Sequence, residues 1–118
     1  MKRVVVESPY AGNVRRNLAY AKLCLKDSLL RGEAPIASHL LFTQPGILDD
    51  NNSEERKLGI EAGLAWVSVA DLQVFYVDLG MSNGMQSAFG YAIEYSIPVE
   101  KRTLHPDMVA KLKRDFPD

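Results

Sequence analysis

Hydrophobic and polar positions alternate along the chain between strand-like and helix-like patterns. Val4 to Val6 form a continuous β-branched run, which is typical of a strand buried on both faces of a parallel sheet. Between Val14 and Arg31 the apolar side chains recur at helical spacing, with basic residues on the opposite side. Leu72 to Asp78 gives the strongest strand pattern in the chain. The same patterns predict further strands at residues 34–38 and 97–100 and further helices at residues 54–67, 85–95 and 106–116.

The order of these elements is strand, helix, strand, loop, helix, strand, helix, strand, helix. Strands that alternate with helices are joined by right-handed crossovers, so we expect an α/β fold with a parallel sheet and helices packed on it. A chain of 118 residues has the size of one such domain, which we assign to residues 1–118.

Composition and charge exclude several classes of protein. The formal net charge is −1, from 14 Lys and Arg against 15 Asp and Glu, so the chain lacks the positive charge that binds a nucleic-acid backbone or an anionic membrane. Cys24 is the only cysteine, which excludes an intrachain disulfide. No apolar run reaches the roughly 20 residues that span a bilayer, and the run at Val4–Val6 is too short for a signal peptide. We therefore expect a cytoplasmic protein whose partners include neither nucleic acid nor membrane.

The segment from His39 to Ser53 is the least regular part of the chain. It contains Pro45, Gly46 and a run of polar residues before Ser53, so we expect an exposed loop. Loops of this length inside a compact domain are usually functional or disordered. The sequence leaves open whether this segment covers the pocket of its own chain or contacts a neighbouring subunit.

Three segments are expected to meet beyond the carboxyl ends of the strands, where open parallel sheets bind their ligands. They are residues 8–13, 39–44 and 78–85. Gly80 and Gly84 in the third segment would let the backbone approach a ligand closely, and the following helix would point unpaired N–H groups at it. The first segment lacks the G-x-G-x-x-G pattern of a dinucleotide site, and the Gly-Lys-Ser/Thr of a P-loop is absent from the chain.

Short motifs in these segments resemble those of the nucleoside 2-deoxyribosyltransferase-like superfamily, in particular its small members from phages and prophages. The resemblance runs from Val4 to Thr103 and rests on Ser8-Pro9-Tyr10-Ala11-Gly12, Asp71, Ser82-x-Gly84-Met85 and Gly90-Tyr91-Ala92. It implies a flavodoxin/Rossmann-like three-layer α/β sandwich with a four- or five-stranded parallel sheet. It also implies a homodimer or higher homo-oligomer that binds a nucleoside or nucleotide at the strand ends. Active members of the superfamily cleave or exchange the N-glycosidic bond there.

The chain departs from the superfamily at the catalytic position. The resemblance implies a glutamate nucleophile in the helix after the Gly-Met turn, where it would attack the anomeric carbon of the sugar. Depending on the alignment, that position falls on Ala88 or Gln86, and Glu94 lies about two turns further along the helix. We therefore expect a nucleotide-binding protein that lacks this nucleophile, for instance one that sequesters a nucleotide for a phage.

The predicted binding site gathers positions from the three converging segments. They are Ser8, Tyr10, His39, Asp78, Ser82, Asn83, Gly84 and Met85. Ser82 and the amides around Gly84 would hold a 5′-phosphate or a ribose, and Tyr10 would stack on a base or sugar. Structural alternatives stay open, because Tyr10 could pack over the sheet end, His39 could bond to backbone and Asp78 could cap nearby N–H groups.

Two other functions stay open at this point. In the first, a relocated carboxylate replaces the missing glutamate in an N-glycoside hydrolase or deoxyribosyltransferase, with Asp78 and Glu61 as candidate acids and His39 as a further catalytic candidate. In the second, the chain is an oligomeric interaction protein with a vestigial pocket. No motif indicates a cofactor. His39 and His105 lack a third ligand at metal-binding spacing, so we expect no metal site.

Overall fold

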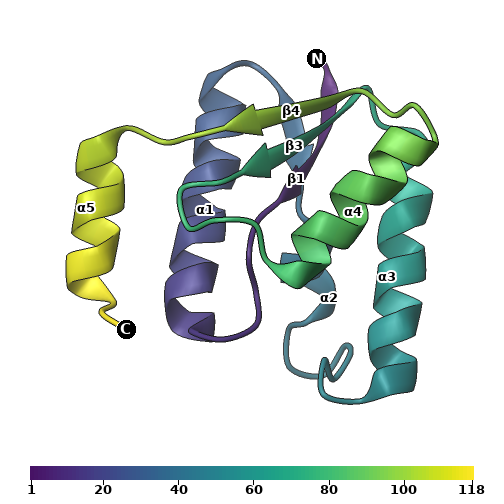
Figure 1. Ribbon diagram of the computed structural model, residues 1–118, viewed down its shortest axis with the longest axis horizontal. Helices are drawn as coiled ribbons and strands as arrows, with labels where there is room; N and C mark the ends of the chain where they lie inside the picture. Colours follow the sequence, from purple (N-terminus) through teal and green to yellow (C-terminus); the bar gives the residue numbers. More distant parts are fainter.

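The computed structural model describes residues 1–118 and contains four strands and five helices (Figure 1). In chain order they are β1 (Arg3–Glu7), α1 (Val14–Leu30), β2 (Ala34–Ile36), α2 (Ser38–Phe42), α3 (Ser53–Val67), β3 (Leu72–Tyr76), α4 (Asn83–Glu94), β4 (Val99–Arg102) and α5 (Pro106–Asp115). The fourth strand begins at Val99 rather than at Ile97, because Ser96 adopts a left-handed backbone (φ 55°) that belongs to the turn after α4. None of the helices has the length and apolar character needed to cross a membrane.

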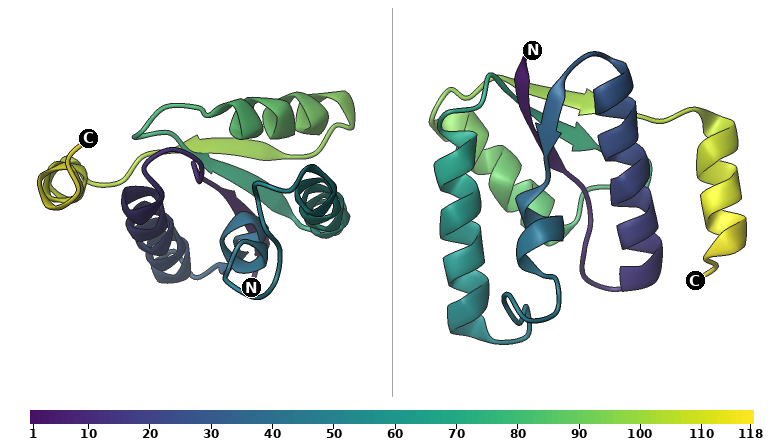
Figure 2. Two further views of the ribbon diagram at one scale, coloured as in Figure 1. Left: turned by 90° about the horizontal axis from the view of Figure 1, so that it is seen from below. Right: turned by 180° about the vertical axis from the view of Figure 1, so that it is seen from behind.

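All four strands are parallel and lie in the order β2-β1-β3-β4. β1 and β3 form the centre of the sheet, paired from Val4 opposite Leu72 to Glu7 opposite Phe75. Helices flank the sheet, with α4 on one face and α1 on the other (Figure 2). This architecture confirms the predicted flavodoxin/Rossmann-like α/β fold, with a sheet of four strands.

The two faces of the central strands have different neighbours. One face packs against α1 and α5 in a buried cluster that includes Val4, Val6, Tyr20, Cys24, Val74, Tyr76 and Leu112. Successive side chains of a strand point to opposite faces, so Val5 and Glu7 of β1 face the other way, together with Gln73 and Phe75 of β3. On that side Phe75 contacts Phe89 of α4, with ring centroids 5.3 Å apart. A carboxyl and a carboxamide therefore lie on the face that α4 covers.

A buried ion-pair network joins the edge strand β4 to the turn between α1 and β2. The Arg102 guanidinium donates to both carboxylate oxygens of Glu33 at 2.7 Å and to Glu100 at 3.0 Å. The Tyr76 hydroxyl accepts from Arg102 at 3.4 Å and donates to Asp27 at 2.7 Å. The hydrogen bonds from Arg102 hold the pKa of Glu33 at about 2, so the pair is fully charged at neutral pH.

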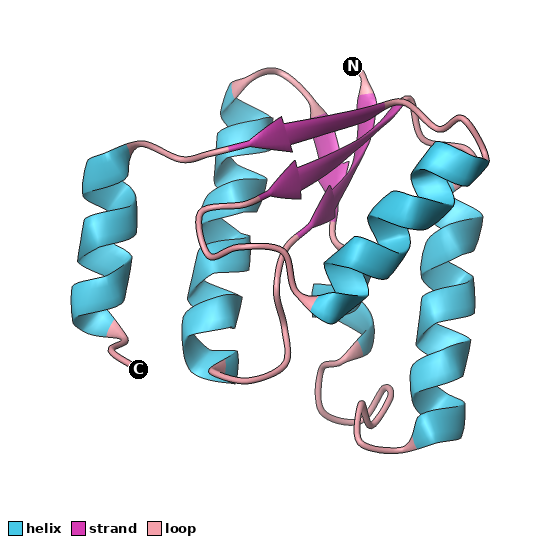
Figure 3. Ribbon diagram, in the orientation of Figure 1, coloured by secondary structure: helices cyan, strands magenta, loops and turns pink.

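The segment from His39 to Ser53 is not the continuous loop that the sequence predicts. Residues 38–42 form the short helix α2, and residues 43–52 connect it to α3 (Figure 3). The predicted strand over residues 34–38 accordingly ends at Ile36. A helix of five residues makes little more than one turn, which is too short for hydrophobic periodicity to resolve. His39 therefore lies in a helix and not at the end of a strand.

Gly63 allows α2 to pack closely against α3. It is buried in the middle of α3, and a Cβ atom at this position would lie 2.8 Å from Ser38 Oγ. A glycine inside a helix lowers the stability of that helix by about 1 kcal/mol relative to alanine. The close approach of α2 explains why glycine occupies this position. This contact, together with contacts between α2 and β1, fixes His39 beside the end of the central strand.

Candidate functional site

A cavity of about 810 Å³, the main cavity below, lies beyond the carboxyl end of β1 and beside the start of α4, which follows β3. The next strand in the chain, β2, lies on one side of β1, and the strand after it, β3, lies on the other side, so the main cavity lies where the strand order reverses. Open α/β sheets bind their ligands at this point. Of the predicted binding residues, those that line the cavity are Ser8, Tyr10, His39, Ser82, Asn83, Gly84 and Met85. Three segments far apart in the sequence thus meet around one space.

Asp78 is the predicted binding residue that does not line the main cavity. Its carboxylate accepts hydrogen bonds from the Tyr20 hydroxyl at 2.7 Å and from the Leu104 amide at 3.0 Å. These contacts join the end of β3 to α1 and to the segment before α5, so the structure assigns Asp78 the capping role. Glu61, the other candidate for a relocated acid, is exposed on α3 and also lies outside the cavity lining. Neither acid is placed to act on a ligand in this cavity.

Ser8 and His39 contact each other in the main cavity. Ser8 Oγ lies 2.9 Å from His39 Nε2, and both side chains are largely buried. Burial lowers the pKa of His39 to about 4, so the imidazole is neutral at pH 7. Its Nδ1 atom is buried without a hydrogen-bond partner. A neutral imidazole of such low pKa is a weak base, and its observed contact with Ser8 is a hydrogen bond.

Two polar side chains that the sequence analysis missed, Glu7 and Gln73, line the sheet side of the main cavity. Gln73 is 1% exposed, and its Nε2 donates a hydrogen bond to Glu7 Oε1 at 3.1 Å. Burial raises the pKa of Glu7 to about 7, and the hydrogen bond from Gln73 opposes that rise. The sequence contains a signal for Gln73, which is a polar residue inside the otherwise apolar strand Leu72–Tyr76, and a weaker one for Glu7, which follows three valines at the end of Arg3–Glu7.

The first turn of α4 closes another side of the main cavity. Ser82 is the N-cap of this helix, and its Oγ accepts a hydrogen bond from the Met85 amide at 3.2 Å. The first N–H groups of a helix have no partner within it, so the amides of Asn83 and Gly84 are available to a ligand. A Cβ atom added at Gly84 would meet no other atom within 4 Å, which shows open space beside this backbone.

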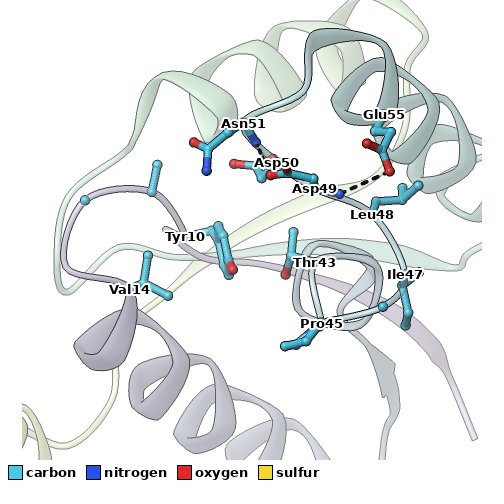
Figure 4. A pocket seen from close by; sticks show the side chains of 13 residues that line it. Tyr10, Val14, Thr43, Pro45, Ile47, Leu48, Asp49, Asp50, Asn51 and Glu55 are labelled. Atoms are coloured by element: carbon cyan, nitrogen blue, oxygen red, sulfur yellow. Dashed lines mark hydrogen bonds between the residues drawn. The ribbon is translucent and has the colours of Figure 1, made fainter.

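A second cavity of about 750 Å³ adjoins the main one on the side of the loop between α2 and α3 (Figure 4). Figure 4 shows Tyr10 opposite Thr43 and Asp50 of this loop segment. These three residues, with Leu48 and Glu55, line both cavities. Residues of the segment 43–51 therefore line a cavity of their own chain, and a contact with a neighbouring subunit stays a prediction.

The charged groups that line the main cavity are mostly acidic. They comprise the carboxyl groups of Glu7, Asp50 and Glu55 and a single cationic side chain, Arg56. No three His, Cys, Asp or Glu side chains come together in a way that could hold a metal ion. The cavity therefore offers one positive side chain and the helix amides to an anionic group of a ligand.

Comparison with known proteins places this architecture in a family. The family model described as "Domain of unknown function (DUF7768)" matches residues 2–102. The chain belongs to this family. The sequence has no significant match among curated proteins.

A solved structure similar to this DUF7768 chain is that of a 2-deoxyribosyltransferase from the psychrotolerant bacterium Bacillus psychrosaccharolyticus. The two share 16% sequence identity with a TM-score of 0.60, over 92% of this chain and 80% of the other. At this level of identity the likeness shows a shared fold. It agrees with the superfamily fold that the motifs around Tyr10 and Gly84 indicate, while the phage origin stays a prediction.

Proposed function

We propose that the main cavity binds a nucleoside or a nucleoside monophosphate. The observation that carries this proposal is the meeting of the β1–α1 loop, α2 and the first turn of α4 around one space at the reversal point of the sheet. A volume of about 810 Å³ lies within the range of small-molecule sites. The similar solved protein, a 2-deoxyribosyltransferase described as a biocatalyst for the synthesis of nucleosides, supports the same class of ligand.

The lining residues supply the contacts that such a ligand needs. Tyr10 offers an aromatic ring to the face of a base. The amides of Asn83 and Gly84 offer donors and the positive end of the α4 dipole to a ribose or a 5′-phosphate. Because three carboxyl groups and one arginine line the cavity, we expect at most one phosphate group on the ligand and not a triphosphate. With Ala88 or Gln86 at the position where the resemblance implies the superfamily's nucleophile, binding alone would serve a phage by sequestering the nucleotide.

We also propose that the protein forms a homodimer or higher homo-oligomer. Four large apolar side chains are more than half exposed near the carboxyl ends of α3 and α4, namely Trp66, Val69, Ile93 and Tyr95. Figure 1 shows these two helix ends next to each other. Exposed apolar side chains that gather in one region of a surface favour association with a partner. Light scattering coupled to size exclusion should give at least twice the 13.1 kDa chain mass for the wild type and a lower mass after Trp66→Ser.

A melting screen tests the binding proposal directly. A ligand that binds only the folded state raises its stability by about 2.7 kcal/mol at a hundred times the Kd. We therefore expect at least one nucleoside or nucleoside monophosphate, offered at millimolar concentration with cyclic nucleotides for comparison, to raise the melting temperature. The absence of any shift would contradict binding and favour an interaction protein with a vestigial pocket.

Replacing Tyr10 by Ala should raise the Kd of the ligand found in this screen by about tenfold or more. The reason is that a base that stacks on an aromatic ring gains about 1–3 kcal/mol of binding free energy. Isothermal titration calorimetry measures the loss. Tyr10→Phe keeps the ring and should retain most of the affinity. Met108→Ala on α5, an element that contributes no residue to the cavity lining, is the control that should leave the Kd unchanged.

A further inference from the structure

Glu7 is the carboxyl group at the sheet side of the main cavity, and it has no cationic partner. It ends β1, one of the two central strands, and its side chain points to the face that α4 covers. None of the ion pairs of the protein includes Glu7. The other two carboxyl groups of the lining, Asp50 and Glu55, come from the loop after α2 and the first turn of α3.

One oxygen of this carboxyl group is held in place and the other is free. Glu7 Oε1 accepts the hydrogen bond from Gln73 Nε2 at 3.1 Å, and the structure shows no hydrogen bond to Oε2. Gln73 is fully buried in the sheet, so it fixes the orientation of the carboxyl group. The free oxygen is available to a ligand or a water molecule in the cavity.

Keeping an acid in this position destabilises the fold, because ionising a buried carboxyl group without a counter-ion costs desolvation free energy. Besides the carboxyl groups of Asp50 and Glu55, the polar groups that line the cavity include Gln73 of β3, His39 of α2, Arg56 of α3 and Tyr91 of α4. Of these, His39 is neutral at pH 7 and Arg56 is exposed. Burial raises the pKa of Glu7 to about 7, and a general base is most effective when its pKa lies near the working pH.

We propose that Glu7 is the catalytic base for hydrolysis of the N-glycosidic bond of a nucleoside bound in the main cavity. This inference rests on the proposed function, since it takes the nucleoside as the ligand. Of the two positions where the resemblance to the superfamily implies a nucleophile, Ala88 lines the cavity but carries only a methyl group, and Gln86 is not among the lining residues. With no carboxylate at that position, we take water as the group that attacks the sugar.

The reaction uses water as its only co-reactant. The Glu7 carboxylate takes a proton from a water molecule while the water oxygen bonds to the anomeric carbon. The bond between that carbon and the base breaks, and its electron pair goes to the base nitrogen. The proton then passes from Glu7 through solvent to this nitrogen, which regenerates the carboxylate. The products are the free base and the free sugar, or the sugar phosphate when the substrate is a monophosphate.

The experiment offers common ribonucleosides and 2′-deoxyribonucleosides to the full-length protein and measures both melting shift and released base. We expect base release from the wild type and a loss of about 100-fold or more in Glu7→Gln, because a positioned general base contributes about 10² to 10⁴ in rate. The same nucleoside should still raise the melting temperature of Glu7→Gln. Glu61→Gln removes an exposed carboxylate outside the cavity and should release base at the wild-type rate.

A pH profile separates catalysis from a structural role. The wild-type rate should rise with pH and level off above about pH 7, where Glu7 is ionised. Gln73→Leu removes the hydrogen bond that stabilises the carboxylate, so its profile should move to higher pH. Two results would overturn this inference and leave the proposed function intact. In the first, Glu7→Gln releases base at the wild-type rate; in the second, the wild type binds a nucleoside without releasing base. If no nucleoside shifts the melting temperature of the wild type, the proposed function fails and this inference fails with it.

Discussion

Replacing Glu7 by Gln is expected to stabilise the folded protein at pH 8 by up to about 3 kcal/mol. In the folded state burial raises the pKa of Glu7 to about 7, against an ordinary value of 4.5. Each unit of pKa difference between the folded and unfolded states is worth about 1.4 kcal/mol. The folded protein binds this proton more tightly, so its stability falls as pH rises from about 4.5 to 7. Glutamine keeps the shape of the side chain and carries no charge, so it avoids that loss.

Urea unfolding of the wild type and of Glu7→Gln across this pH range measures the effect. The difference in unfolding free energy should be small at pH 4, grow between pH 4.5 and 7, and stay constant at higher pH. Glu61→Gln, which removes an exposed carboxylate on α3, should show no such growth. A difference between wild type and Glu7→Gln that is constant with pH would contradict the burial of an unpaired carboxyl group in the cavity.

Replacing Arg102 by Met is expected to destabilise the fold by about 3–5 kcal/mol, because it leaves a buried network without its cation. Arg102 is 5% exposed and holds Glu33 through two hydrogen bonds of 2.7 Å. The Glu33 carboxylate would remain partly buried after the change, with Ser28 as its other hydrogen-bond donor. The Tyr76 hydroxyl would lose its contact with the guanidinium.

The same network predicts a pH dependence at acid pH. Hydrogen bonds from Arg102 lower the pKa of Glu33 to about 2, so this carboxylate adds stability above about pH 4.5 that is lost as the pH falls toward 2. In Arg102→Met most of that loss between pH 4.5 and 2 should disappear. Arg114→Met, an exposed arginine of α5 without an ion pair, is the matched control and should change stability little. A cost below about 1 kcal/mol for Arg102→Met would contradict a buried ion pair.

The regular elements could be predicted from the sequence because each long helix and each strand carries its own hydrophobic pattern. The alternation of strands and helices then determines that the sheet is parallel. It follows that the segments containing Tyr10 and Ser82 meet at the same edge of the sheet, as they do in the structure. The helix α2 escaped prediction because it is only five residues long.

The individual roles of polar residues were harder to predict, because they depend on partners far away in the chain. Asp78 follows a strand at the expected place, but Tyr20, which is 58 residues away, binds its carboxylate. The sequence analysis missed Glu7 because a glutamate after three valines is typical of the polar end of a strand, which by itself does not indicate a ligand contact. Only the pairing of β1 with β3 places it next to Gln73, on the face that lines the cavity.

An NMR titration tests the proposed binding site most directly. Labelled protein would be titrated with nucleosides and nucleoside monophosphates to millimolar concentration while its backbone amide resonances are followed. Our account predicts saturable shifts that cluster at Ser8, Tyr10, Asn83 and Gly84 and leave α5 unchanged. Resonances that do not move with any of these compounds, or shifts that are confined to α5, would contradict it.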